Sequence, residues 1–161
     1  MKMDVSGTGE FLKKIEKLSN DAVPMEKAAL YQGAKIMADA VKAEMQGLRT
    51  TENWRNMVAY NMGGMATLSD MQKEGLLTGF GLSKMKYADG SVYLVMGFNG
   101  YNNVKTKRWP NGQPNRMIAA VVERGSSFFI AQPFFKRAVN DAKQQAIDAV
   151  QTALKNAIAN L

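Results

Sequence analysis

Apolar residues recur at helical spacing through most of the first 48 positions, in two stretches on either side of Pro24. Thr8 is a suitable N-cap for the first stretch, whose apolar positions are Phe11, Leu12, Ile15 and Leu18. Because proline favours the first turn of a helix, we expect a second helix to begin near Pro24 and to end near Gly47. Its apolar stripe advances by three or four residues at a time through Leu30, Ala34, Met37, Val41, Met45 and Leu48.

The pattern is less regular in the part of the chain that follows. No period is sustained over residues 49–66, and a glycine pair interrupts them near their end, so we expect irregular or weakly β structure there. A short helical turn over residues 69–74 is predicted by the spacing of Ser69 and Gln72, which is that of a capping box. Gly75 is placed to end this turn.

Further along, the spacing of apolar residues changes to that of a strand. Apolar side chains occupy every second position from Val92 to Phe98. Asp89-Gly90 is a strong signal for a two-residue hairpin turn, which would join this strand to one over about residues 82–87. The sequence therefore predicts an antiparallel sheet.

Residues 99–116 collect the asparagines, glycines and prolines that favour turns, so we expect a long loop. This segment carries four cations, two aromatic residues and no acid. Cations interleaved with aromatic residues are typical of surfaces that bind nucleic acid, and the alternative is a solvated loop anchored by its tryptophan. A long loop within a domain is usually functional or mobile. The candidate interaction residues are Tyr101, Lys105, Lys107, Arg108, Trp109 and Arg116.

Two further helices are expected in the last third of the chain. Residues 114–124 have four apolar positions on one face and a stop at Gly125, and residues 126–132 can be extended. The last helix begins near Pro133 and can run to Leu161, which is about 40 Å at 1.5 Å per residue. Pairs of phenylalanines around its start are expected to fix it to the sheet.

These elements predict an α+β fold in a single domain over residues 1–161. An antiparallel β-sheet is packed by the long C-terminal helix and the N-terminal helices, with an extended loop or β-arm. The length of 161 residues fits one domain, and 46% hydrophobic residues suffice for a core without a metal or a disulfide.

The amino-acid composition limits the kinds of catalytic and metal site that the chain can form. The chain has no cysteine and no histidine, which excludes thiol catalysis, Ser-His-Asp triads, Cys/His zinc sites and histidine-ligated haem. The 14 acidic residues are scattered among lysines, so we expect no enzyme, no metal and no cofactor. With 21 basic residues the net charge is +7, which favours polyanions or acidic protein surfaces as partners. No signal-peptide or membrane-spanning pattern occurs, so we expect a soluble protein that is not exported.

Five segments follow one another in a recognisable order. They are GLLTGFGLSKM (75–85), VMGFNGYN (95–102), KTKRWPNGQPN (105–115), VERGSSF (122–128) and QPFFKRAV (132–139). Each motif is short, but their order and spacing, together with the N-terminal helices, resemble the HK97 gp10-like family of tailed-phage tail components over most of the chain.

The resemblance implies a structural role at the neck or the head-proximal end of a phage tail. Members of the family look like tail-completion proteins that form sixfold rings between the head-closure layer and the tail tube. The expected partners are further copies of the chain in a hexameric ring, the head-closure or connector protein, the tail tube protein and the genomic DNA in the channel. No membrane partner is expected. The expected location is the virion, with assembly in the cytoplasm of the bacterial host.

The runner-up interpretation belongs to a different class of protein. It is a small basic nucleic-acid-binding protein that uses Lys105, Lys107, Arg108 and Trp109. Such a protein would bind DNA with an affinity that falls steeply with salt.

Overall fold

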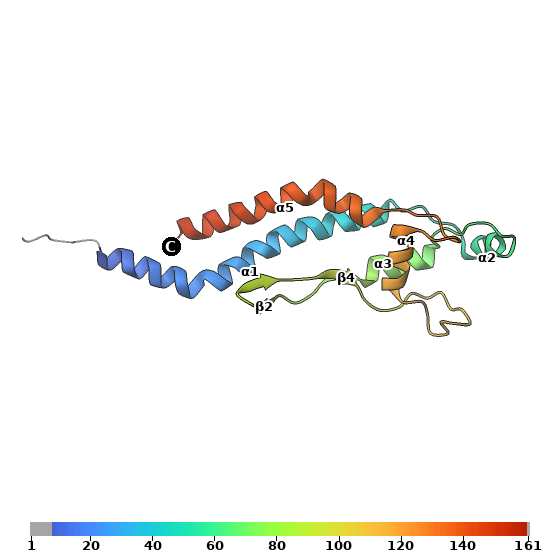
Figure 1. Cartoon of the computed structure of the whole chain (residues 1–161), viewed down its shortest axis with the longest axis horizontal. Coiled ribbons are helices and arrows are strands. Elements are labelled where there is room, and N and C mark those ends of the chain that lie inside the picture. The colour runs from blue at the N-terminus through green and yellow to red at the C-terminus, as the bar shows by residue number, and fades with distance from the viewer. Residues whose placement is uncertain (1–7, 161) are drawn as a thin grey trace, which may run out of the picture.

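A single helix, α1 (Thr8–Gln46), begins the computed structural model, which describes residues 8–160. Two helices separated near Pro24 were predicted, and that prediction is wrong because the helix continues through the proline. Pro24 has no N–H to donate to the carbonyl one turn earlier, and a proline inside a helix kinks its axis. Figure 1 shows α1 bending in its N-terminal half. The predicted end near Gly47 is confirmed.

The last helix, α5 (Phe134–Ala159), packs antiparallel along α1 (Figure 1), and its predicted start near Pro133 is confirmed. Small residues let the two axes approach closely, since a Cβ on Gly33 would lie 2.6 Å from Val150 Cγ2. The buried alanines of the two helices are Ala29, Ala34, Ala38, Ala138, Ala142 and Ala146. Farther along the pair, Arg137 Nε and Glu44 Oε2 form an ion pair at 2.8 Å. This packing stabilises α1 as a helix beyond Pro24, because helices depend mainly on tertiary contacts.

Helix α2 (Asn53–Asn61) lies where irregular or weakly β structure was predicted, so that prediction is wrong for this segment. Asn56 Nδ2 donates to the Thr67 carbonyl oxygen at 2.8 Å, and Asn56 Oδ1 accepts from the Thr67 N–H at 3.0 Å. The two bonds hold α2 against the segment that follows it. Apolar periodicity does not reveal such a contact.

Helix α3 (Asp70–Gly79) begins with the predicted capping box. The Ser69 N–H donates to Gln72 Oε1 at 3.0 Å, and the Gln72 N–H donates to Ser69 Oγ at 3.3 Å. The prediction that Gly75 ends the helix is wrong, because α3 continues for four more residues. A Cβ on Gly75 would lie 2.5 Å from Asn102 Cβ and 2.6 Å from Asn115 Oδ1. This glycine therefore lets two later asparagines pack directly on the backbone of α3.

Short strands form one long antiparallel hairpin, which we call the β-ribbon (residues 80–98). In it β1 (Phe80–Leu82) pairs with β4 (Met96–Phe98), and β2 (Lys86–Ala88) pairs with β3 (Ser91–Tyr93). The predicted turn is confirmed: Asp89 at φ 52° and Gly90 at φ 75° have the positive φ values of a type I′ hairpin. The ribbon lies along α1 (Figure 1).

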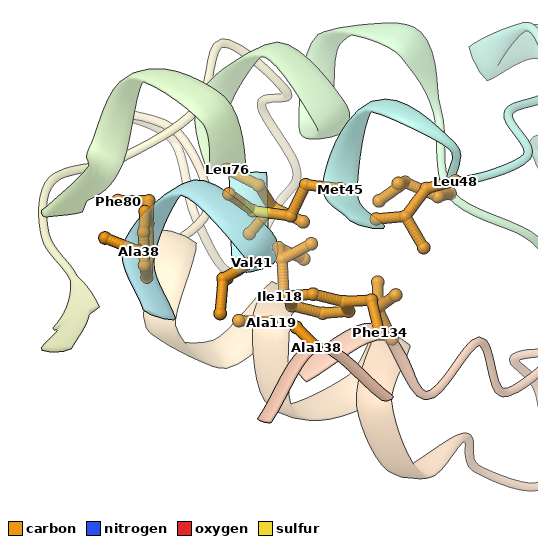
Figure 2. Close-up of a cluster of buried hydrophobic side chains, with 12 residues drawn as sticks. Ala38, Val41, Met45, Leu48, Leu76, Phe80, Ile118, Ala119, Phe134 and Ala138 are labelled. Atoms are coloured by element: carbon orange, nitrogen blue, oxygen red, sulfur yellow. The ribbon is translucent and has the colours of Figure 1, made fainter. Parts of the chain in front are cut away.

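Helix α4 (Asn115–Arg124) closes the core, and Gly125 at φ 72° ends it as predicted. Phe98 of the ribbon contacts Phe80 at a centroid distance of 5.2 Å and Phe134 of α5 at 6.1 Å, so aromatic rings join the ribbon to the last helix. Figure 2 shows the buried cluster. Its members are Ala38, Val41, Met45, Leu48, Leu68, Leu76, Phe80, Ile118, Ala119, Val122, Phe134 and Ala138. The fold is α+β in a single domain, as predicted.

Replacing Gly75 by alanine should lower the free energy of unfolding by about 1–3 kcal/mol, because the new methyl group overlaps side chains in a filled space. Thermal unfolding followed by circular dichroism measures the loss. Gly81→Ala is the matched control, because a Cβ at Gly81 meets nothing within 4 Å and glycine weakens a strand. Equal melting temperatures for the two variants would contradict this packing.

Candidate functional site

The interaction residues predicted from the sequence lie mainly in a loop over residues 99–114, which projects near α3 and α4 (Figure 1). The base of this loop is held by Asn102, whose side chain is only 4% exposed. Asn102 Oδ1 accepts from the N–H of Val104 at 2.9 Å and from that of Gln113 at 3.4 Å. The Asn102 N–H donates to the Gln113 carbonyl oxygen at 2.9 Å. These bonds tie the two sides of the loop together.

A second set of contacts fastens the loop to the neighbouring helices. Gln72 Nε2 of α3 donates to Gln113 Oε1 at 2.7 Å, and Asn115 Nδ2 of α4 donates to the Asn99 carbonyl oxygen at 2.9 Å. Gly112, at φ 105°, approaches the opposite main chain so closely that no side chain would fit. Sequence reasoning missed these anchors. The available signal was the density of asparagine and glycine, which favour local side-chain bonds and positive φ.

The tip of the loop is a tight turn that presents two cations. The Thr106 N–H donates to the Trp109 carbonyl oxygen at 3.1 Å, and the Trp109 N–H donates to the Thr106 carbonyl oxygen at 3.0 Å. Lys107 and Arg108 are therefore the two central residues of the turn, and both are exposed. Arg108 Cζ lies 5.6 Å from the ring centroid of the half-buried Trp109, within the range of a cation–π interaction. We call residues 105–109 the basic turn.

The structure brings some predicted site residues together and separates two of them. The basic turn contains three of the four predicted cations and the tryptophan. Tyr101 lies at the base of the loop, bridged to Pro114, and is 65% exposed. Arg116 is not part of the loop, because α4 begins at Asn115, and its side chain lines a separate groove.

That groove lies between the β-ribbon, α4 and the start of α5, and it has a volume of about 770 Å³. Gly81 and Gly97 pair across the ribbon, and a Cβ on either would meet nothing within 4 Å. The backbone of β1 and β4 therefore has free space beside it at these two glycines. Arg116 and Arg124 of α4 supply positive charge to the lining.

Glu123 also lines the groove, and it acts as a cap for α5. Its carboxylate accepts from the N–H of Phe135 at 2.8 Å and from the N–H of Lys136 at 3.0 Å. A carboxylate is favourable at a helix N-terminus, where N–H groups are unpaired and the helix dipole is positive. No motif marks this cap in the sequence, because the carboxylate comes from a different helix.

A second hollow, which we call the apolar slot, lies between α1, α5 and the β-ribbon and has a volume of about 360 Å³. These three elements run alongside one another in Figure 1. The slot is lined by Leu30, Gly33, Ala34, Met37, Leu94, Met96, Ala146, Ile147, Val150 and Gln151. Sequence reasoning did not identify it, because its walls come from parts of the chain that are far apart.

The described residues, 8–160, contain no group of three or more acidic side chains that could hold a metal ion. Within the same range no helix is long and apolar enough to cross a membrane.

Comparison with protein-family models, with curated proteins and with solved structures finds no match to this chain. The geometry singles out three surfaces suited to binding: the basic turn, the groove and the apolar slot.

Replacing Asn102 by alanine should loosen the loop, because the N–H groups of Val104 and Gln113 lose their shared acceptor. An unpaired buried donor costs about 1–3 kcal/mol, and each 1.4 kcal/mol is a factor of ten in an equilibrium. We therefore expect trypsin to cleave the basic turn about tenfold faster or more. Asn103→Ala, at an exposed neighbouring position, should cleave at the wild-type rate. The anchoring role fails if both variants are cleaved equally fast.

Proposed function

We propose that this protein is a structural virion protein of a tailed bacteriophage. It is a ring-forming neck or tail-completion subunit that joins the head connector to the tail tube around the DNA channel. It works by binding its neighbours and not by catalysis. The observation that carries the proposal is the large surface that the single chain leaves exposed.

The chain exposes 11351 Å², whereas a compact monomer of 17.7 kDa exposes about 8,000 Å². Residues 1–7 and 161 account for at most about 1,300 Å² of this at the rate of an unfolded chain. An excess of roughly 2,000 Å² therefore remains for the described residues. A subunit in a ring has two neighbours, and a stable interface takes about 800 Å² from each partner. The excess matches what a ring subunit would bury.

The exposed surface also has suitable chemistry at both ends of the molecule. Val58, Met62 and Met65 lie exposed in and just after α2, and Ile158 lies exposed near the C-terminal end of α5. Figure 1 places α2 at one end and the C-terminus of α5 towards the other. Apolar residues on separate faces fit head-to-tail contacts, which close into rings, better than a single twofold patch.

The ring predicts a defined mass for the purified protein. We expect light scattering after gel filtration to give about 106 kDa, which is six copies of the 17.7 kDa chain. Negative-stain microscopy should show rings with a central hole. Phage particles made without the protein should accumulate as separate heads and tails. A protein that stays monomeric at every concentration, in a phage whose heads and tails still join without it, would falsify the proposal.

The basic turn supports nucleic-acid binding as a second candidate function. Lys107 and Arg108 stand at the tip of a fixed turn, and the loop around them has no carboxylate to neutralise them. In a ring the same turn would contact an acidic face of the next protein layer or the DNA in the channel. The salt dependence of DNA binding separates the two roles.

A DNA-binding turn predicts a measurable change on replacing Lys105, Lys107 and Arg108 together by alanine. The slope of log affinity against log salt falls by about 0.9 for each phosphate that the protein no longer neutralises, so we expect a decrease of about 2.7. The matched control replaces three exposed lysines of α5: Lys136, Lys143 and Lys155. This control variant also loses three positive charges, but the slope of log DNA affinity against log salt should stay close to that of the wild-type protein. Equal slopes for the two variants would dismiss the turn as a DNA site.

A further inference from the structure

The N-terminal part of α1 extends beyond the helix that packs along it. α1 has 39 residues and α5 has 26, a difference of about 20 Å at 1.5 Å per residue. The contacts of Gly33 with Val150 and of Glu44 with Arg137 set the antiparallel register. Continued to its end, this register places the last residues of α5 beside α1 near Ala22. The backbone before that point continues past the end of α5, as Figure 1 shows.

This projecting segment, residues 8–21, has the sequence of an amphipathic helix. Phe11, Ile15 and Leu18 follow helical spacing, with lysine and glutamate residues between them. An amphipathic helix depends on the packing of its apolar face. The two ends of the stripe are seven positions apart, which is about 10 Å along a helix. We therefore expect the apolar stripe of this segment to pack against an apolar surface of similar length.

The apolar slot has the matching dimensions. The residues of α1 that line it run from Leu30 to Met37, whose positions are again seven apart, or about 10 Å. Leu94 of the β-ribbon and Ile147 of α5 line its two sides, and Ile147 is 39% exposed. A hollow between two helices and a strand suits an amphipathic helix, because apolar residues at i, i+4 and i+7 can enter it together.

A copy cannot fill its own slot with its own segment. Both are parts of α1, and the slot begins at Leu30, only nine residues after the projecting segment ends, so the helix would have to break and reverse. We propose that residues 8–21 of one copy occupy the apolar slot of the next copy. This inference rests on the proposed ring. Donor and acceptor are different surfaces, so each copy is a donor to one neighbour and an acceptor for the other, which is the contact that closes into a ring.

Three single substitutions in the full-length chain test the contact. Ile15→Lys places a charge in the donor stripe, and Ile147→Lys places one in the slot at a partly exposed position. Each should lower the mass found by light scattering from that of the ring to 17.7 kDa. Gln145→Lys is the matched control, because Gln145 is exposed on the same helix but outside the slot, and it should leave the ring intact.

Mixing the two defective variants gives the decisive measurement. The Ile15→Lys chain keeps its slot and the Ile147→Lys chain keeps its donor helix, so one intact contact remains in the mixture. We expect a heterodimer of about 35 kDa, two chains of 17.7 kDa, which neither variant forms alone. If Ile147→Lys unfolds, Gln151→Trp at the exposed rim replaces it, because a large ring there blocks the slot without disturbing the core.

The outcomes separate this contact from the ring itself. A monomeric wild-type protein overturns the proposed function. A wild-type ring that survives Ile15→Lys, Ile147→Lys or Gln151→Trp overturns only the contact, and so does a mixture of defective chains that stays monomeric.

Discussion

The close packing of α1 on α5 is the interaction on which the other elements depend. Gly33 lets the helices touch at Val150, and buried alanines continue the contact towards the ion pair of Glu44 and Arg137. α3 and the β-ribbon also pack on α1, so α1 is the common support of the fold. A larger residue at Gly33 would push α5 outward and would move a wall of the apolar slot. The stability of the fold and the shape of the proposed interface therefore depend on one contact.

Two buried asparagines impose a second constraint, at the end of the molecule that carries the loop. Asn102 and Asn115 pack on the backbone of α3, where Gly75 leaves room for them. Among the described residues, Asn102 Nδ2 and Asn115 Oδ1 are buried without a hydrogen-bond partner. The other polar atoms of the two side chains pair with main-chain groups of the loop, which would otherwise be unpaired. Those bonds offset the two unpaired atoms, because each satisfied main-chain group avoids a desolvation cost of about 1–3 kcal/mol.

Local signals in the sequence predicted the elements that a few adjacent residues determine. The Asp89-Gly90 turn and the capping box at Ser69 form as predicted, since each is specified within four residues. The predictions are wrong where a contact with a distant part of the chain determines the local structure. Helix α1 continues through Pro24, and Gly75 makes room for packing instead of ending α3. The surfaces follow the same rule. The cations of the basic turn are sequence neighbours and were predicted together, whereas the groove and the apolar slot are assembled from distant segments.

The net charge of +7 restricts how copies of this chain can meet. Like charges repel over about 8–10 Å at physiological salt, so a contact between copies is more stable through apolar surface than through cationic loops. The apolar slot lies away from the basic turn, and a contact through it keeps the cations of neighbouring copies apart. In a head-to-tail ring every copy has the same orientation, so all the basic turns would lie at one level. The three cations of each basic turn would then recur around the ring as separate positive patches at one level, facing either the DNA or an acidic surface of the next ring.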